Sequence, residues 1–287
     1  MPEHNVQLSD QVVVLGTMHG KEQVIGPILT QELGVEVIVP IDFNTDQWGT
    51  FTREMDRWAD QRTTARVKAK QAMEILHRLV GVASEGSFGP HPTFPWLAVN
   101  RELVVLVDAK LGLEVVGEVV TTKTNYRQTQ VSHITEALEF ARQVGFPSHG
   151  LVVMASETIP THPLIFKGIL TEVQLKTAME QVLAHYPHSR VQLETDMRAM
   201  MNPTRMEAIA QATHEVVRKL RQTCPLCNYP GFERVEQQSG LNCGQCNQPT
   251  PLIRLDIYQC QHCGHRHNHL FPQGKLADPM YCSYCNP

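Results

Sequence analysis

Apolar runs and stretches of helical periodicity alternate between residues 12 and 222, a pattern typical of a layered α/β fold. Runs that resemble buried strands occupy 12–16, 35–40, 80–84, 102–108, 113–121, 150–155 and 190–194. Helical spacing extends over 21–33, 53–79, 131–144, 171–185 and 203–222. The runs on either side of Lys110–Gly112 predict a hairpin. We therefore expect an α/β domain with a mixed sheet and helices on both faces.

The pattern changes at Thr223, where helical periodicity ends and Pro, Gly, Asn, Gln and Cys dominate. All eight cysteines follow this point as four Cys-x-x-Cys pairs: Cys224 and Cys227, Cys243 and Cys246, Cys260 and Cys263, Cys282 and Cys285. The sequence thus predicts two regions, an α/β domain over 1–222 and a cysteine-rich region over 223–287.

Two Cys-x-x-Cys turns can complete a tetrahedron of thiolates around Zn²⁺, and these pairs have the spacing of such sites. We expect two small four-cysteine zinc ribbons, each holding one structural Zn²⁺. Sequential pairing is favoured, in which Cys224–Cys246 holds one ion and Cys260–Cys285 the other. An interleaved arrangement, with the first and third pairs sharing an ion, satisfies the same chemistry. Disulfides are disfavoured because no secretion signal precedes the pairs.

Charge and hydropathy narrow the class of protein. The 287 residues carry a formal net charge of −4, which argues against a protein devoted to binding bulk nucleic acid. Met1–Gln7 lacks the basic and apolar regions of a signal peptide, and no apolar run is long enough to cross a bilayer. These features predict a cytoplasmic protein without a membrane partner.

Few lysines and arginines lie in the cysteine-rich region, which favours a protein partner there, with nucleic acid as the alternative. Histidines are frequent near its end, at His262, His265, His267 and His269. We interpret them as part of a polar ribbon loop, although a further metal or an anion is a second interpretation.

Polar clusters follow several predicted strands, where α/β sheets place their ligands. Thr17, His19 and Lys21 lie between the first strand and a helix, and backbone N–H groups at a helix start favour anions. Glu85 follows a buried strand and leads into a glycine-rich loop with Ser87, which suggests a metal ligand or general base. Each cluster could instead be a capped turn.

Two further clusters carry charge. Asp46 and Glu54 offer hard oxygen ligands that suit Mg²⁺, with simple helix capping as the alternative. Arg66 and Lys70, one helical turn apart, could face a phosphate or solvent.

Arg198 and Arg205 surround the helix start Asn202–Pro203 and favour an anion there, with capping again the alternative. His149 and Lys167 lie in segments that we interpret as tight turns, Phe146–Gly150 and Phe166–Gly168.

Several of the segments that hold these clusters also resemble segments of a known family. Thr17–Glu22, Gly49–Glu54, Ala83–Pro92 and Asp196–Ala199, followed by the terminal cysteine pairs, resemble an uncharacterised bacterial family known as a domain of unknown function. The likeness covers nearly the whole chain, and it implies no activity.

Residues 12–220 are also similar in order of elements to the inosine/xanthosine triphosphate pyrophosphatases. Their Thr-x-Asn-x-x-Lys turn resembles Thr17–Lys21, with His19 in place of asparagine and the lysine one residue early. Glu54 before an Ala-rich helix, Glu85–Ser87 and Thr204–Arg205 resemble their later motifs.

That resemblance implies that Lys21 and Arg205 hold phosphates, that Glu54 binds Mg²⁺, and that Glu85 binds metal or activates water. The resulting hypothesis is a metal-dependent hydrolase acting on a nucleotide or a related phosphate-containing small molecule. The alternatives are a non-enzymatic zinc-ribbon protein that binds protein or nucleic acid, and ribbons that only cap or dimerise the large domain.

Overall fold

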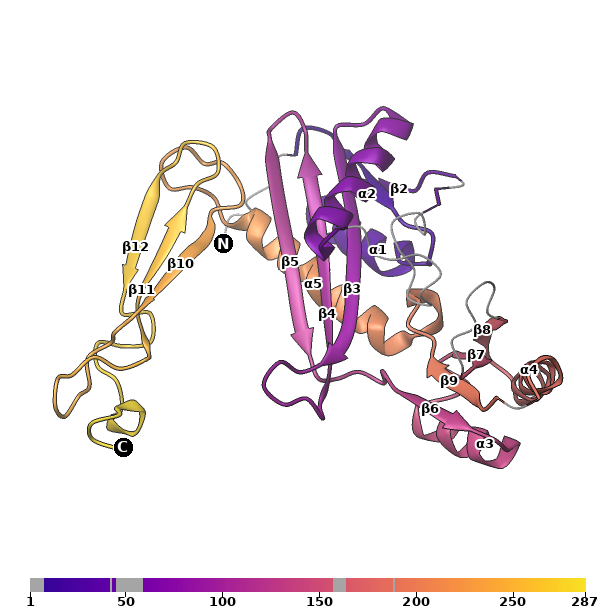
Figure 1. The fold of residues 1–287 in the computed structure, drawn as a ribbon. Helices are drawn as coiled ribbons and strands as arrows, with labels where there is room; N and C mark the ends of the chain where they lie inside the picture. Colours follow the sequence, from indigo (N-terminus) through magenta and orange to yellow (C-terminus); the bar gives the residue numbers. More distant parts are fainter. Residues whose placement is uncertain (1–7, 42, 45–58, 157–163, 188) are drawn as a thin grey trace. The chain divides into compact units, whose positions relative to one another are not determined.

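The computed structural model describes residues 8–41, 43–44, 59–156, 164–187 and 189–287 (Figure 1). The chain divides into two compact units. The larger unit comprises Asp10–Val107 and Val116–Val216, and the smaller one contains Asp108–Val115 and Val217–Pro287. The last segment of the smaller unit begins at Val217, upstream of the predicted boundary at residue 223. Over the described ranges, no helix combines the length and the apolar character needed to cross a membrane.

A five-stranded sheet supplies most of the strands of the larger unit. Its strands are β1 (Val12–Gly16), β2 (Glu36–Ile38), β3 (Val80–Pro90), β4 (Ala98–Asp108) and β5 (Leu113–Thr121), in the order β2-β1-β3-β4-β5. The end of β4 and the start of β5 belong to the smaller unit. β1 pairs in parallel with both β2 and β3. β4 runs opposite to its neighbours β3 and β5 (Figure 1). The predicted mixed sheet is confirmed.

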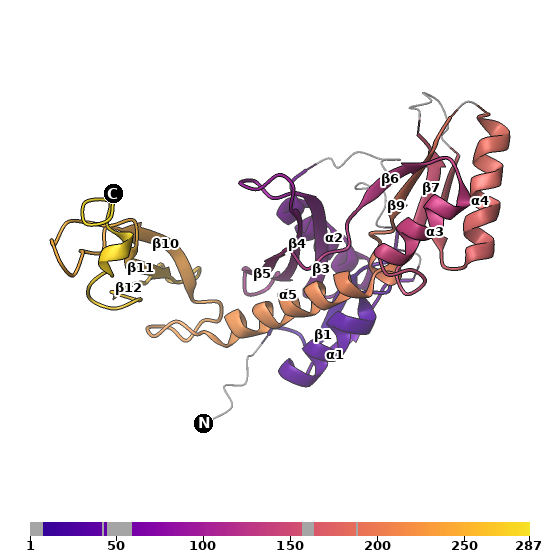
Figure 2. The same cartoon turned by 90° about the horizontal axis from the view of Figure 1, so that it is seen from below.

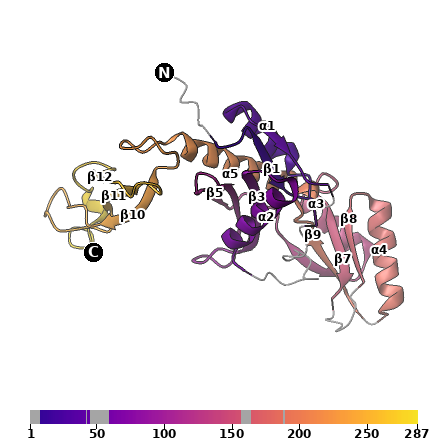
Figure 3. The ribbon, with the colours of Figure 1, turned by 90° about the horizontal axis from the view of Figure 1, so that it is seen from above.

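Helices cover both faces of this sheet. α2 (Gln61–Leu76) packs in a cluster with β3, β4 and Val116 of β5. The next residue, Gly117, faces α5 (Pro203–Arg221), where an added Cβ would overlap the carbonyl oxygen of Ala212. Since consecutive strand residues face opposite ways, α2 and α5 lie on opposite faces. α1 (Glu22–Leu33) lies beside α5, with Nδ1 of His214 2.7 Å from Oε1 of Glu32 (Figures 2 and 3).

A second sheet belongs to the same unit. It contains β6 (Gln128–Val131), β7 (Leu151–Ala155), β8 (Ile165–Ile169) and β9 (Val191–Thr195), antiparallel in the order β6-β9-β7-β8. α3 (Ile134–Gln143) and α4 (Glu172–His185) bury apolar side chains against it. A short 3₁₀ helix, Ala199–Met201, links β9 to α5.

Two interpretations of local sequence were wrong. The expected loop from Gly86 is strand as far as Pro90, because β4 pairs along it. The expected tight turn at Phe166–Gly168 lies inside β8, where Gly168 has φ of 69° next to a register shift in the β7–β8 pairing. Glycine at a β-bulge reads as a turn from sequence alone.

The described part of the smaller unit contains a three-stranded antiparallel sheet. β10 (Glu233–Ser239), β11 (Ile253–Gln259) and β12 (Arg266–Leu270) follow one another in the order β10-β11-β12. A 3₁₀ turn, Pro279–Tyr281, comes before the last cysteine pair.

Candidate functional site

The carboxyl end of β1 is a topological switch point. The chain leaves β1 through α1 to reach β2 on one side, and it later reaches β3 on the other side after α2. α/β sheets of this kind hold ligands in the crevice beyond the strand ends at such a point. The segment Thr17–Lys21 occupies this position and leads into the first turn of α1.

Lys21 is buried at this switch point, with 7% of its surface exposed. β1 ends at Gly16, which is paired with Ala83 of β3. The residue after Ala83 is Ser84, and its carbonyl accepts a hydrogen bond from Nζ of Lys21 at 2.9 Å. Burial, reinforced by Arg205, lowers the pKa of Lys21 to about 7, while Glu85 opposes the shift. No salt bridge joins Lys21 to a carboxylate within the described ranges. An anion bound here would supply Lys21 with the negatively charged partner that no carboxylate of the described residues provides through a salt bridge.

His19 lies among the same cations. Burial lowers its pKa to about 3, and Lys21, Arg205, Arg198 and Lys68 act in the same direction in that order. The imidazole is therefore neutral at pH 7 and carries a proton on only one nitrogen. The structure thus brings Lys21, Arg198 and Arg205, which are far apart in the sequence, around His19.

Glu85 lies within β3, not at the end of a strand as we expected. Its carboxylate forms a buried ion pair with Lys68 of α2. Lys68 was not among the predicted site residues, although it lies on the buried side of α2 with Ala65 and Ala72. The nearby Lys70, which we considered for a phosphate, is exposed. Ser87 is two residues beyond Glu85, so it faces the same side of β3.

The two predicted anion-binding arginines contact carboxylates of the protein. Nε of Arg205 donates to Oε1 of Glu102 at 2.6 Å, and both side chains are buried. The guanidinium also lies 5.5 Å from the centre of the Phe88 ring. Arg198 binds Asp196, with Nη2 2.7 Å from Oδ2. Their assignment as direct anion ligands stays a prediction, and Glu102 and Asp196 are partners that sequence reasoning did not find.

His149 has both ring nitrogens close to hydroxyl groups. Nε2 is 2.9 Å from Oγ1 of Thr204 and Nδ1 is 3.0 Å from Oγ of Ser148. Contacts of this kind, to hydroxyl groups of the protein, are typical of a structural histidine.

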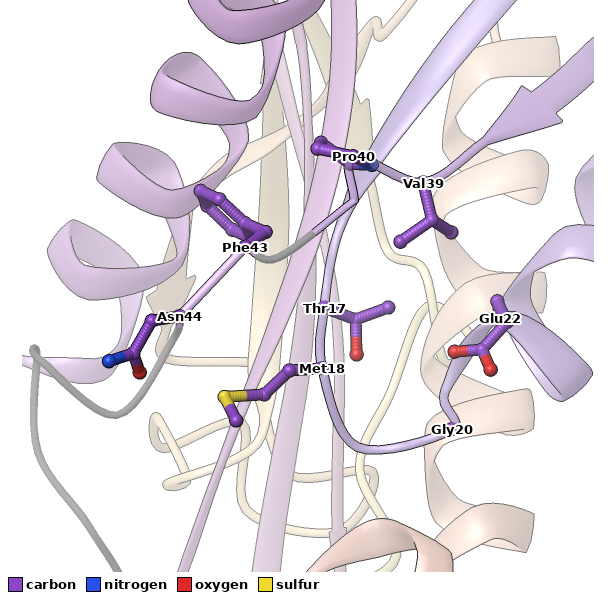
Figure 4. Close-up of a pocket in the computed structure, with 8 residues that line it drawn as sticks. All are labelled: Thr17, Met18, Gly20, Glu22, Val39, Pro40, Phe43 and Asn44. Atoms are coloured by element: carbon purple, nitrogen blue, oxygen red, sulfur yellow. The ribbon is translucent and has the colours of Figure 1, made fainter.

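A hollow of about 520 Å³ opens beside the switch point (Figure 4). The segments after β1 and β2, with the start of α1, supply its described lining: Thr17, Met18, Gly20, Glu22, Val39, Pro40, Phe43 and Asn44. This volume lies in the range of small-molecule sites, which is roughly 300–1,000 Å³.

The proposed Mg²⁺ ligands, Asp46 and Glu54, lie outside the described residues. Within the described ranges, the only close groups of three or more possible metal ligands are formed by cysteines. The described residues therefore do not assemble a Mg²⁺ site, and the Mg²⁺ expectation stays a prediction.

The eight cysteines form two groups that could each hold a metal ion. One contains Cys224, Cys227, Cys260 and Cys263; the other contains Cys243, Cys246, Cys282 and Cys285. Sulfur atoms from different pairs approach to 3.6–3.9 Å. A tetrahedral ion with metal–sulfur bonds of about 2.3 Å sets its sulfurs about 3.8 Å apart, so the thiolates fit Zn²⁺.

The favoured sequential pairing was wrong, and the interleaved arrangement is present. Antiparallel strands explain it. The first pair precedes β10 and the third follows β11, and Glu233 at the start of β10 is opposite Gln259 at the end of β11. The second pair follows β10 and the fourth follows β12, at the other end of the sheet. Successive pairs therefore alternate between the two ends.

The cysteine turns share one local geometry. In each, the residue after the second cysteine donates its backbone N–H to the carbonyl of the first cysteine, at 2.8–3.2 Å. Three of these residues, Asn228, Asn247 and Gly264, have positive φ, which asparagine and glycine tolerate best. Backbone N–H groups of Cys246 and Gln245 lower the pKa of Cys243 to about 7, whereas the neighbouring thiols raise the pKa of Cys285 to about 12.

The histidines of this region make ring contacts. His262 stacks on Tyr229 with centroids 4.8 Å apart, and His265 lies 6.1 Å from Phe232. His267 and His269 are exposed on β12.

Comparison with known families gives one match. The family described as Domain of unknown function (DUF6671) matches residues 68–287, and the chain belongs to this family. Neither a curated protein nor a solved structure matches the chain.

Proposed function

We propose that this member of the DUF6671 family hydrolyses a nucleotide or a related phosphate-containing small molecule at the carboxyl end of β1. The observation that carries the proposal is the buried Lys21, whose pKa is lowered to about 7 beside other cations at a switch point. A phosphate there would restore the full charge of Lys21 and receive its hydrogen bonds.

The other residues take distinct roles in this proposal. His19 donates its N–H to a phosphate oxygen. Arg198 and Arg205 stay paired with Asp196 and Glu102 and add positive electrostatic potential at the site. Ser84 has a buried hydroxyl without a hydrogen-bond partner in the described part of the chain, which a ligand or water can satisfy. Glu85 accepts a proton from water as the water oxygen attacks phosphorus, and the bond from phosphorus to the leaving oxygen breaks.

Hydrolysis of a panel of nucleoside triphosphates tests this proposal, with release of phosphate and pyrophosphate as readouts. Each substrate is measured with Mg²⁺ and with EDTA, because the Mg²⁺ requirement is itself a prediction. We expect Glu85→Gln to reduce turnover by about a hundredfold or more, the usual effect of losing a general base. Lys70→Met, an exposed lysine on the adjacent α2, serves as the control. No release by the wild type, or full activity in Glu85→Gln, contradicts the proposal.

We further propose that the two cysteine groups hold structural Zn²⁺. Four thiolates leave no open coordination position, and the smaller unit needs metal because its sheet is thin and largely exposed. Elemental analysis of purified protein should find two zinc ions per chain. A different metal, or fewer than two ions after zinc-replete expression, contradicts this assignment.

A binding role without hydrolysis is the second candidate function. Apolar side chains around the last cysteine turns favour it, since Leu276, Met280 and Tyr284 are 58%, 60% and 78% exposed. A second copy of the chain is the simplest partner for such a surface. Sedimentation velocity should then detect a dimer that Met280→Asp dissociates, and a monomer at all concentrations contradicts this candidate.

A further inference from the structure

The hollow beside Lys21 is larger than a phosphate group requires. It measures about 520 Å³, and Met18, Val39 and Pro40 give it apolar walls. A ligand that filled it would carry an apolar or planar body as well as a phosphate. Inorganic phosphate or pyrophosphate would leave these walls without a contact.

Glu22 is the charged side chain in the described lining of the hollow. Figure 4 shows its carboxylate turned toward the Thr17 side chain. In the part of the chain that the structure describes, this carboxylate takes part in no salt bridge or hydrogen bond. An ionised carboxylate only accepts hydrogen bonds, so its natural partner is a group with N–H or O–H donors.

The segment from the end of β1 to the start of α1 therefore carries both signs of charge, with Glu22 lining the hollow and Lys21 buried next to it in the sequence. Lys21 and His19 suit an anion, whereas Glu22 repels one. A single ligand satisfies both signs of charge if it has a phosphate at one end and hydrogen-bond donors at the other.

We propose that the hollow receives the base of a nucleotide and that Glu22 selects bases with two adjacent N–H donors, as guanine has. The inference rests on the proposed phosphate site for the other end of the ligand. A carboxylate presents two oxygens in one plane, which match two parallel N–H groups and form charge-assisted hydrogen bonds with them. Hypoxanthine, which lacks the 2-amino group, offers one donor fewer, and ribose 5-phosphate offers no base.

Calorimetric titration of the full chain with GMP, IMP and ribose 5-phosphate tests the inference. We expect GMP to bind about tenfold more tightly than IMP, the effect of one charge-assisted hydrogen bond, and ribose 5-phosphate to bind most weakly. Glu22→Gln should remove the preference for GMP over IMP, and it should not weaken the binding of ribose 5-phosphate, because the substitution removes a carboxylate that repels the phosphate. Glu172→Gln is the matched control, because Glu172 is also an acidic residue in the first turn of a helix, α4.

The results separate this inference from the proposed function. Equal affinities for GMP and IMP, a preference that survives Glu22→Gln, or no binding of any nucleotide overturns the inference. A GMP preference that Glu22→Gln abolishes supports it even where no triphosphate is hydrolysed, and the hydrolase proposal alone then fails. Hydrolysis of triphosphates without any base preference contradicts the role of Glu22 and leaves the hydrolase proposal standing.

Discussion

At the scale of single residues, the larger unit depends on buried charges that have well-defined partners. Glu102 and Arg205 are both buried, and their ion pair crosses from β4 to α5. Gly86 lies against this pair, where any larger residue would displace it. A buried pair of this kind contributes little net stability when intact, but losing one partner is costly.

Gly86→Ala tests this close approach. An added Cβ would overlap Oε1 of Glu102 and lie 2.7 Å from Nη2 of Arg205. We expect a loss of about 1–3 kcal/mol in the free energy of unfolding, as is typical of overpacking. Gly89→Ala on the same strand is the control, since a Cβ there meets no atom within 4 Å. Urea unfolding measures both, and equal midpoints would refute the packing argument.

Glu102→Gln tests the charge itself. The substitution keeps the shape of the side chain and leaves Arg205 buried without its counter-charge, so we expect a loss of about 3–5 kcal/mol. The exposed pair of Arg101 and Glu118 provides the comparison. Glu118→Gln should change the free energy of unfolding by less than about 1 kcal/mol. Similar losses of unfolding free energy in Glu102→Gln and Glu118→Gln would contradict the claim that burial makes the loss of Glu102 costly.

The lowered pKa of Lys21 predicts how stability depends on pH. The pKa falls from 10.5 to about 7 on folding, chiefly through burial. Between these values the unfolded chain binds a proton that the folded chain does not, so this residue makes stability rise with pH from about 7 to about 10.5. Lys21→Met should flatten that rise, whereas Lys70→Met should not. Urea unfolding at several pH values measures it, and parallel profiles for wild type and Lys21→Met would contradict the prediction.

At the scale of elements, the antiparallel order of β10, β11 and β12 decides which cysteines share an ion. The interleaved pairing follows from strand direction, which spacing along the sequence does not reveal.

A fourfold variant separates the two pairings. Cys224, Cys227, Cys260 and Cys263 are all changed to serine, which removes one complete group in the interleaved arrangement. One zinc ion per chain should then remain. Sequential pairing would break both sites and leave none, so a count near zero by elemental analysis in a folded variant would contradict the structure.

Most strands and helices were predictable from hydrophobic periodicity, including the hairpin around Lys110 and the start of α5 after Asn202. The elements that were not predicted depend on strand pairing in the folded chain, which a local sequence pattern does not show. Gly86 and Gly89 suggested a loop, but pairing with β4 keeps this segment extended. β6 is a polar edge strand, which periodicity does not distinguish from a loop.

The candidate site was predictable only in part. Thr17–Lys21 follows a strand and opens a helix, which sequence can recognise. Lys68 and Glu102 became visible only as partners of Glu85 and Arg205, because ion pairs between distant elements leave no local pattern.

At the scale of the whole molecule, the proposed site joins residues inside and outside the matched family region. Glu85 and Arg205 lie within the matched residues 68–287, whereas His19, Lys21 and Glu22 lie before the matched region. The proposed function therefore depends on the folded chain as a whole and not on the matched segment alone.

The affinity of the full chain for pyrophosphate, measured by calorimetry at pH 7.5 for wild type, Lys21→Met and Lys70→Met, tests most directly whether an anion binds at Lys21. We expect Lys21→Met to weaken binding by about tenfold or more, the effect of one charge-assisted contact, and Lys70→Met to leave it unchanged. Equal affinities for wild type and Lys21→Met, or no binding to the wild type, would contradict the account.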